Sequence, residues 1–400
     1  MTLRPLRAVA GWERPRRGAL AAAFIAFEIC YIGSDRFQDT VYNNYSRFAF
    51  ALVHGRLWID WPGPYIDAVL WHGYRYIVND PVPGLLLTPF ALVYGRNTNQ
   101  TVLAGVMTAV ATYFAYRLAQ RLGASEAIAS ALTLFFLLGT DLFWCAALGD
   151  VWFVAQVCAM AFLTAAIYEI LTRRRAPLVA VLFALAALSR FTIALSAPAL
   201  AAFFVWSIDG KRLPNARRDL ARFGVALAPF ALLWIAYNEA RWGVPYDSGH
   251  TIFFHQDAGV GSSVGSPFSL SNLPMQLYSF FIQAPSYTQA RPYLVPELTG
   301  VALTFTSPAL LLALRVRGPA VTVAALWLAT FLAAGPSLLY YVNGSSQYGM
   351  RHAMDFEPYL FVLMILAVRQ RLSWPGTAAI AWSCIAGVYG VWYWQVFVRA

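Results

Sequence analysis

The stretch VWFVAQVCAMAFLTAAIYEIL, residues 151–171, decides the fold class. Its only charged residue is Glu169, and an arginine triplet at 173–175 follows almost at once. A helix rises ~1.5 Å per residue, so a run of about 20 apolar residues crosses the ~30 Å hydrocarbon core of a bilayer. Because the core offers backbone groups no water, a helix is the structure that satisfies them. The stretch therefore predicts a transmembrane helix with a basic flank.

Comparable apolar runs recur along the whole chain. Hydrophobic residues make up 59% of the 400 residues and charged residues 12%, whereas soluble chains carry about 25% charged residues. We expect an all-α polytopic membrane protein of about 11 transmembrane helices. It forms a single transmembrane domain over residues 1–400, with no separate soluble domain. The predicted spans are residues 18–33, 100–119, 125–143, 151–171, 177–189, 191–207, 221–238, 301–314, 319–341, 354–368 and 376–398.

The distribution of charge predicts the orientation. The net charge is +10, and all basic residues except Lys211 are arginines. Most of them lie in short connections on one side of the predicted spans, which is the cytoplasmic side by the positive-inside rule. We expect a multi-pass protein of the bacterial inner (cytoplasmic) membrane, with an uncleaved first span, a cytoplasmic N-terminus and a periplasmic C-terminus. No basic stripe lies on a soluble face, so the charge does not indicate a nucleic-acid partner.

Two long loops, about 34–99 and about 239–300, fall on the periplasmic side. Long ordered loops are usually functional. In the first loop, apolar residues at three- and four-residue spacing predict an amphipathic helix on the membrane surface: Tyr42, Tyr45, Phe48, Ala49 and Leu52. LPMQLYSFFI at 273–282 predicts another in the second loop. The apolar segment 83–95 is too short to cross, so we expect a re-entrant or interfacial helix there.

The segment SDRFQDTVYNN, residues 34–44, follows the first predicted span and carries two acids. Asp35 and Asp39 are four residues apart, so a helical continuation would place both on one face. A carboxylate that is partly desolvated at the membrane surface has a raised pKa and can act as a general base. The alternative is that both acids cap or solvate the helix end.

Three arginines near predicted span ends are candidates for binding a phosphate, because the planar guanidinium matches phosphate oxygens. They are Arg190, Arg241 and Arg351. Each has a structural alternative. Arg190 could snorkel to the surface, Arg241 could belong to a polar span end, and Arg351 could pair with Asp355 four residues later.

Other polar residues complete the candidate substrate-binding set, with structural roles as caps or ion-pair partners as the alternative. They are Asp67, His72 and Arg75 of the first loop, and Asp355 and Glu357 at the entry to the tenth predicted span.

An outer turn joins the third and fourth predicted spans. There we expect Asp141 and Asp150 to be polar turn residues and Trp144 and Trp152 to anchor the membrane interface.

No cofactor and no metal site are predicted. The four cysteines lie inside or at the edge of apolar runs and are interpreted as small hydrophobic residues. No His/Cys cluster has zinc spacing, and the sequence contains no Walker loop, GxGxxG or HExxH. A divalent metal is compatible with the sequence but not indicated by it.

In the order of its segments the chain resembles the glycosyltransferase C superfamily, especially the bacterial membrane proteins related to protein O-mannosyltransferases and lipid A aminoarabinose transferases. The stretches that carry the resemblance are FALVHGRLWID (50–60), WHGYRYIVNDPVPGLLLTPFALVYG (71–95), GTDLFWCAALGDVWFVAQ (139–156), LSRFTIALSAPAL (188–200), YNEARWGVPYDSGH (237–250), LTFTSPALLLAL (303–314) and QYGMRHAMDFEPYLFVLM (347–364).

The resemblance implies a membrane glycosyltransferase. Such enzymes transfer a sugar from a polyprenyl-phosphate donor to a lipid, glycan or protein acceptor on the periplasmic face, inverting the anomeric centre. An acid of the first outer loop acts as base, which corresponds to Asp35 or Asp39. Relatives of the mannosyltransferase branch have two adjacent acids there, whereas this chain has two acids four residues apart. We favour Asp39, because it leads into the predicted surface helix.

Two other functions are compatible with the sequence. The chain could be a transporter or flippase of a lipid-linked sugar, although transporters tend to show inverted repeats and none is found. It could also be a non-catalytic envelope protein that binds polyprenyl phosphate.

Overall fold

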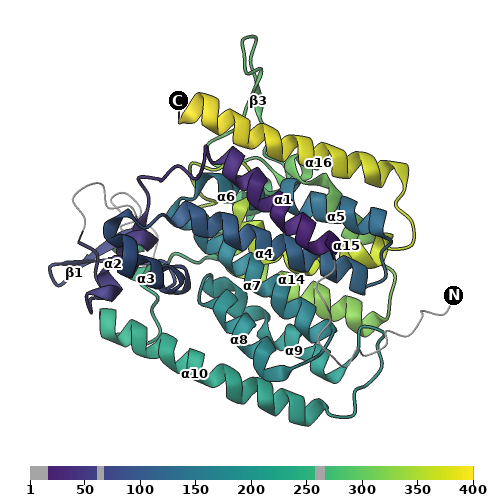
Figure 1. Cartoon of the computed structure of the whole chain (residues 1–400), viewed down its shortest axis with the longest axis horizontal. Coiled ribbons are helices and arrows are strands. Elements are labelled where there is room, and N and C mark those ends of the chain that lie inside the picture. The colour runs from purple at the N-terminus through teal and green to yellow at the C-terminus, as the bar shows by residue number, and fades with distance from the viewer. Residues whose placement is uncertain (1–16, 61–66, 257–265, 400) are drawn as a thin grey trace.

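The computed structural model describes residues 17–60, 67–256 and 266–399. Its long helices run roughly side by side between two ends of the molecule (Figure 1). The segments of this bundle are α1 (Arg17–Gly33), α4 (Gln100–Arg121), α5 (Glu126–Leu138), α6 (Leu142–Leu148), α7 (Val151–Leu171), α8 (Ala176–Ala187), η2 (Phe191–Ser196), α9 (Ala197–Val205), α10 (Ala216–Trp242), η4 (Pro308–Arg315), α14 (Ala320–Leu339), α15 (Glu357–Val368) and α16 (Trp374–Tyr393).

Shorter elements build the two long loops. The first loop holds α2 (Asn44–Val53), β1 (Ala68–Trp71), β2 (Tyr74–Ile77), α3 (Val82–Tyr94) and η1 (Gly95–Asn97). The second holds α11 (His250–Gln256), η3 (Leu270–Asn272), α12 (Leu273–Phe281), β3 (Ser286–Tyr287), β4 (Leu294–Val295) and α13 (Leu303–Thr306). Two more short helices, η5 (Arg351–Asp355) and η6 (Trp394–Val398), precede α15 and follow α16. The end of the bundle where α2, α3 and β1 gather is called the loop end below (Figure 1).

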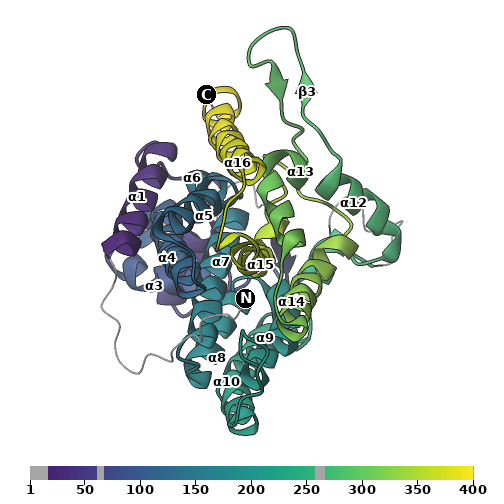
Figure 2. The ribbon, with the colours of Figure 1, turned by 90° about the vertical axis from the view of Figure 1, so that its right-hand side faces the viewer.

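Each loop also contains an antiparallel hairpin that the sequence did not predict. β1 pairs with β2, with Trp71 opposite Tyr74, and β3 pairs with β4. The second hairpin projects away from the bundle in both views (Figures 1 and 2). The predicted amphipathic helix of the first loop is α2, but its buried residues Tyr45, Phe48 and Ala49 belong to the protein core, and the helix packs against α3.

Every predicted span coincides with helical structure, although not always with one straight helix. Among the described residues, α4, α7, α10 and α14 are long and apolar enough to cross a membrane by themselves. α5 and α6 form a further candidate, bent by 44° at the break between them. The predicted span 301–314 is mostly the 3-10 helix η4, which begins at Pro308, a residue with no backbone N–H to continue α13. The helices support a multi-pass membrane protein, and the number of crossings stays a prediction.

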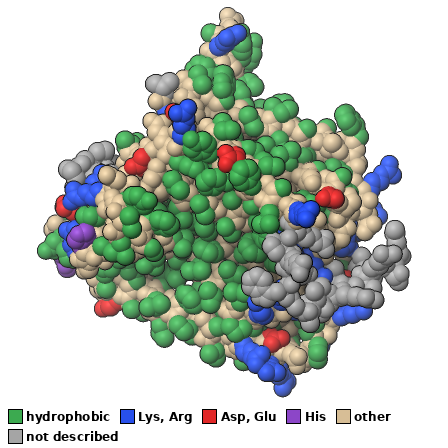
Figure 3. All heavy atoms as spheres, viewed as in Figure 1, with side chains coloured by type: hydrophobic (Ala, Val, Ile, Leu, Met, Phe, Trp, Pro, Cys, Tyr) green, Lys and Arg blue, Asp and Glu red, His purple; other side chains and the backbone are tan. Residues whose placement is uncertain are grey.

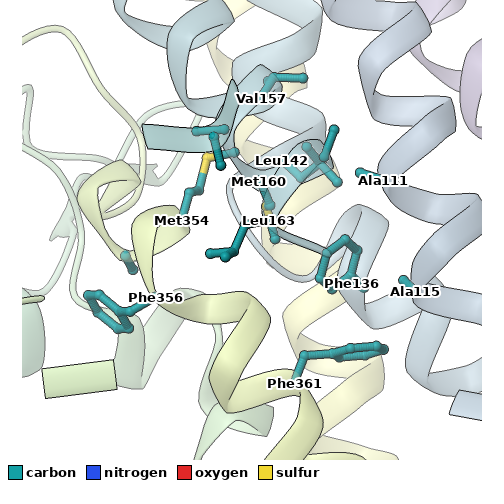
Figure 4. Packing of buried hydrophobic residues seen from close by; sticks show 14 of the residues in the cluster. Ala111, Ala115, Phe136, Leu142, Val157, Met160, Leu163, Met354, Phe356 and Phe361 are labelled. Atoms are coloured by element: carbon teal, nitrogen blue, oxygen red, sulfur yellow. The ribbon is translucent and has the colours of Figure 1, made fainter. Parts of the chain in front are cut away.

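The core lies around α7, which is buried on almost every side. Figure 4 shows its side chains Val157, Met160 and Leu163 among those of α4, α5, α6, η5 and α15. Alanines on α4 such as Ala111 and Ala115 allow close helix packing, which matters where lipid removes the hydrophobic drive to associate. All four cysteines are free, buried thiols.

The surface of the bundle is suited to a bilayer. Hydrophobic side chains cover the middle of the face in Figure 3, while charged side chains lie mostly toward the two ends and on the projecting hairpin. On α10, for example, Val225 is 75% exposed and Leu232 is 65% exposed. A helix whose apolar residues face outward in this way is stable in hydrocarbon rather than in water.

The first helix ends at the residue where the predicted span 18–33 ends and does not continue to Asp35 and Asp39. α1 stops at Gly33, and Asp35, Arg36 and Phe37 have left-handed backbones with φ of +49°, +63° and +56°. This reversal tucks the Phe37 ring against Phe27 of α1, with centroids 5.2 Å apart. Asp35 and Asp39 therefore do not share a helical face, because burial of Phe37 reverses the chain between them.

Candidate active site

Asp39 lies shortly before α2 and is exposed at the surface. Both oxygens of its carboxylate are held, Oδ1 by the amide of Thr40 at 2.9 Å and Oδ2 by Nδ2 of Asn43 at 3.1 Å. Partial burial raises the pKa of Asp39, although both hydrogen bonds and the charge of Arg47 act in the opposite direction. A carboxylate with a fixed orientation and a raised pKa has the properties of a general base.

Asp35 differs from Asp39 in its surroundings. It is exposed in the turn after α1, and its side chain forms no hydrogen bond or ion pair with any residue that the structure describes. Of the two acids, Asp39 is the one whose carboxylate is oriented by its neighbours.

Trp152, at the start of α7, contacts both the first loop and Arg351. Its Nε1 donates a hydrogen bond to Asp67, and its ring lies 5.4 Å from that of Tyr42, three residues after Asp39. The guanidinium of Arg351 lies 5.7 Å from the same ring. Trp152 therefore holds the first loop and Arg351 together, and its role as an anchor at the membrane interface stays a prediction.

Arg351 is buried in η5, where its neighbours orient it. Its Nε donates to Oε1 of Gln347 at 2.8 Å, and its carbonyl accepts a hydrogen bond from Gln156 at 3.1 Å. Burial and the nearby charge of Arg190 lower the pKa of Arg351 to about 10, so the side chain stays charged at pH 7. Its terminal nitrogens make no hydrogen bond within the described part of the chain. Arg351 is thus a buried cation that is available to an anion.

The ion pair suggested for Arg351 and Asp355 is not formed, because Asp355 pairs with Arg190. Nε and Nη2 of Arg190 donate to the two oxygens of Asp355 at 3.2 and 3.0 Å, and Thr192 Oγ1 adds a hydrogen bond at 2.6 Å. Asp355 is fully buried. Arg190 consequently does not snorkel toward water, and it serves as the fixed partner of a buried carboxylate.

Two residues beside this ion pair were absent from the predicted site. Asp80 accepts a hydrogen bond from the amide of Phe191 at 2.9 Å, and burial raises its pKa to about 6. His250 is hydrogen-bonded to Ser248 at 2.8 Å, and burial followed by the charge of Arg190 lowers its pKa to about 4. The signals were an acid directly before Pro81 and a histidine closing the stretch 237–250, but neither spacing shows that both approach Arg190.

Arg241 is committed to the loop backbone. Its Nη1 donates to the carbonyl of Ile77 at 2.8 Å, and its Nη2 donates to Asn238 at 2.8 Å and to the carbonyl of Ser248 at 3.4 Å. The guanidinium also lies 3.8 Å from the ring centroid of Tyr237. Arg241 thereby ties α10 to both long loops.

His72 and Arg75 lie on the hairpin of the first loop. His72 and Gly73 form its tip with φ of +48° and +83°, as a type I′ turn requires, and the His72 ring stacks on Trp71 at 4.9 Å. The carbonyl of Arg75 accepts a hydrogen bond from Ile59 at 2.8 Å. These contacts place both residues on the hairpin of the first loop.

Asp141, Asp150 and Glu357 are buried. The sequence predicted Asp141 and Asp150 as polar turn residues and did not show their burial. Asp150 accepts a hydrogen bond from Arg399 at 2.7 Å. Neither oxygen of Glu357 has a hydrogen-bond partner among the described residues, and one oxygen of Asp141 is likewise unpaired there. Trp144, also expected at the interface, is fully buried against Phe153 and Trp394.

In the described ranges, no group of three or more His, Cys, Asp or Glu side chains is arranged to hold a metal ion. The site instead consists of an oriented exposed acid, a buried cation and a buried ion pair at the loop end. This combination defines a class: multi-pass helical membrane proteins with a polar, anion-compatible site at one membrane face.

Comparison with known proteins refines this class. Residues 79–234 match the family described as dolichyl-phosphate-mannose-protein mannosyltransferase. The matched part contains Asp80, Trp152 and Arg190. The resemblance to glycosyltransferase C membrane proteins inferred from the sequence is confirmed by this match. No curated protein sequence matches the chain.

Solved structures to which this chain shows similarity include ArnT from Cupriavidus metallidurans bound to undecaprenyl phosphate, with 13% identity and a TM-score of 0.49 over 87% of this chain and 59% of that chain. Another is the oligosaccharyltransferase AglB from Archaeoglobus fulgidus, in complex with an inhibitory peptide and a dolichol phosphate, with 15% identity and a TM-score of 0.45 over 95% of this chain and 56% of that chain. This chain thus spans less than three fifths of either solved chain.

Proposed function

We propose that the chain is a membrane glycosyltransferase that moves a sugar from a polyprenyl-phosphate donor to a lipid, glycan or protein acceptor on the periplasmic face. The observation that carries the proposal is the match of residues 79–234 to dolichyl-phosphate-mannose-protein mannosyltransferases. The matched part supplies Trp152 and Arg190, which meet Arg351 and Asp355 of the unmatched part at the loop end. The family match and the polar site therefore overlap at Trp152 and Arg190, whereas Asp39 and Arg351 lie outside the matched residues.

In the proposed reaction an acceptor hydroxyl attacks the anomeric carbon while the bond from that carbon to the lipid phosphate breaks. Asp39 takes the hydroxyl proton, and the polyprenyl phosphate leaves with the electron pair of the broken bond. Attack from the face opposite the phosphate inverts the anomeric centre. A positioned base contributes a factor of about 10²–10⁴. The proposed reaction uses no metal ion or other cofactor.

Arg351 is proposed to bind the departing phosphate. Its guanidinium is buried against Trp152 and Phe153, and only its Nε is committed to a side chain of the described chain. A preorganised cation stabilises developing negative charge more strongly in such a site than in water. Of the other candidates, Asp67 and Asp355 position Trp152 and Arg190, and Arg241 positions the loops. His72 and Arg75, on the hairpin, are proposed to contact the acceptor.

The proposal places the loop end in the periplasm. The basic triplet at 173–175 follows α7, which starts beside the site at Trp152 and so ends on the opposite side. By the positive-inside rule this arrangement supports a periplasmic loop end. With about 11 crossings, as the apolar runs of the sequence predict, the N-terminus would be cytoplasmic and the C-terminus periplasmic. The bilayer would be the bacterial inner membrane.

A transfer assay tests the proposal. Purified protein in nanodiscs is incubated with a panel of polyprenyl-phosphate sugars radiolabelled in the sugar, together with envelope lipids and proteins as acceptors. We expect transfer by the wild type, a loss of about 10²-fold or more in Asp39→Asn, and near-normal transfer in the matched control Asp35→Asn. Equal rates for all three proteins would exclude both Asp35 and Asp39 as the base, and no consumption of any donor would overturn the proposed function.

A further inference from the structure

The last helix brings the end of the described chain back to the first loop. α16 runs to the loop end and continues as η6 (Figure 1). Gln395 donates a hydrogen bond to the carbonyl of Gly33 at 3.0 Å, and the Trp394 ring packs on Trp144 with centroids 5.2 Å apart. These contacts place Arg399 beside the turn between α6 and α7.

Arg399 binds the buried acid of that turn. Its Nη2 donates to Oδ1 of Asp150 at 2.7 Å and to the carbonyl of Leu148 at 3.1 Å. The same Oδ1 accepts a hydrogen bond from the hydroxyl of Thr40. Asp150 is only 6% exposed, so its charge depends on partners inside the protein. Burial raises the pKa of Asp150, while Arg399, Thr40 and the charge of Arg351 act to lower it.

Thr40 in turn holds the neighbouring residues of the first loop. Its amide donates to Oδ1 of Asp39 at 2.9 Å, and its hydroxyl accepts a hydrogen bond from the amide of Tyr42 at 3.1 Å. The amide of Val151 donates to the carbonyl of Tyr42 at 3.0 Å. The segment that carries Asp39 is thus docked on the turn between α6 and α7. The hydrogen bonds of Arg399 to Asp150 and Leu148 in this turn are called the clasp below.

We propose that Arg399 is a positioning residue for Asp39, acting through Asp150 and Thr40. The inference rests on the proposed function, since it takes Asp39 as the base. Without Arg399 the buried Asp150 loses its ion-pair partner and is driven toward its neutral form. A neutral carboxyl is a weaker acceptor for the Thr40 hydroxyl, because hydrogen bonds to ionised groups are roughly twice as strong. The Asp39 carboxylate then loses its fixed orientation.

Hydrogen exchange tests the clasp without reference to activity. In Arg399→Gln we expect the amides of residues 40–43 to exchange about tenfold faster than in the wild type, because the docking of this segment is weakened. Arg399→Lys, which keeps the charge, should restore most of the protection. Arg371→Gln is the matched control, because Arg371 is an exposed arginine in the connection that precedes α16. Unchanged exchange in folded Arg399→Gln overturns the clasp.

Kinetics test the positioning role. We expect Arg399→Gln to lower kcat by about 10- to 100-fold and to leave KM for the polyprenyl-phosphate sugar nearly unchanged, because a small displacement of a catalytic group slows the chemical step. Thr40→Val removes the hydroxyl that links Asp150 to the loop. If the path runs through Thr40, adding Arg399→Gln to Thr40→Val lowers kcat little further.

Failure of the positioning role and failure of the proposed function give different results. Multiplicative losses in the double variant, or a wild-type kcat in Arg399→Gln, overturn the positioning role while the proposed function stands. A wild type with no transferase activity, but with exchange that still depends on Arg399, overturns the proposed function while the clasp stands.

Discussion

Breaking the ion pair between Arg190 and Asp355 should destabilise the protein far more than breaking an exposed one. Asp355 is fully buried and accepts three hydrogen bonds, two from Arg190 and one from Thr192. Asp355→Asn keeps the shape but removes the charge, which leaves the guanidinium of Arg190 without its counter-ion. Removal of one partner of a buried ion pair costs about 3–5 kcal/mol of the free energy of unfolding. Thr192→Val, which removes one hydrogen bond to a charged group, should cost about 1.5–3 kcal/mol.

Unfolding in mixed micelles of dodecylmaltoside and SDS, followed by tryptophan fluorescence, measures these differences. Arg96→Gln is the matched control, because it breaks the pair with Asp60 at 3.3 Å, whose side chains are 48% and 60% exposed. An exposed pair contributes at most about 1 kcal/mol. The double change Arg190→Met with Asp355→Leu removes both charges and should cost less than Asp355→Asn alone. If Asp355→Asn costs no more than Arg96→Gln, the reasoning about this buried pair is refuted.

Three further predictions concern other parts of the molecule. Burial raises the pKa of Asp80 to about 6, above its unfolded value of about 3.9. As the pH rises from about 4 through about 6, the free energy of unfolding of the wild type should therefore fall by about 3 kcal/mol relative to that of Asp80→Asn. A difference between the two proteins that does not change with pH would contradict this. Glu357→Gln should leave the free energy of unfolding within about 1 kcal/mol of the wild type or raise it. The reason is that both Glu357 oxygens are buried without a partner among the described residues. A loss above about 2 kcal/mol would mean that the carboxylate is needed. An impermeant maleimide should label Ser345→Cys in intact spheroplasts and Arg217→Cys only after permeabilisation. Background labelling should be low because the native cysteines are buried. Labelling of Arg217→Cys from outside would reverse the predicted orientation.

The sequence predicts the helices correctly where the composition of neighbouring residues alone determines their boundaries. The apolar run 151–171 is α7 at both boundaries, because its apolar side chains and its charged flank are properties of neighbouring residues. The first loop shows where this fails. Asp35 and Asp39 have helical spacing, yet burial of Phe37 against α1 reverses the chain between them. That contact depends on tertiary packing and leaves no local signal.

The site was harder to predict because its partners are distant in the chain. Arg351 and Asp355 have the spacing of a helical ion pair, but η5 is a 3-10 helix and Asp355 pairs with Arg190, 165 residues away. Trp152 matched the pattern of an interface anchor, because tryptophan near a span end is common at membrane surfaces. Only the fold shows that the same ring meets Tyr42, Asp67 and Arg351. The arginine and acid candidates were visible as residue types, whereas their pairing was not.

A structure of the Asp39→Asn variant with the polyprenyl-phosphate sugar that the wild type transfers would show where the donor binds. The variant keeps the size of the side chain while removing the base, so the donor should remain intact. We predict density for the lipid phosphate at the loop end, within hydrogen-bonding distance of the terminal nitrogens of Arg351, with the sugar between the phosphate and Asn at position 39. Density for the phosphate at the opposite end of the bundle, beside Arg315 and Arg317, would contradict it.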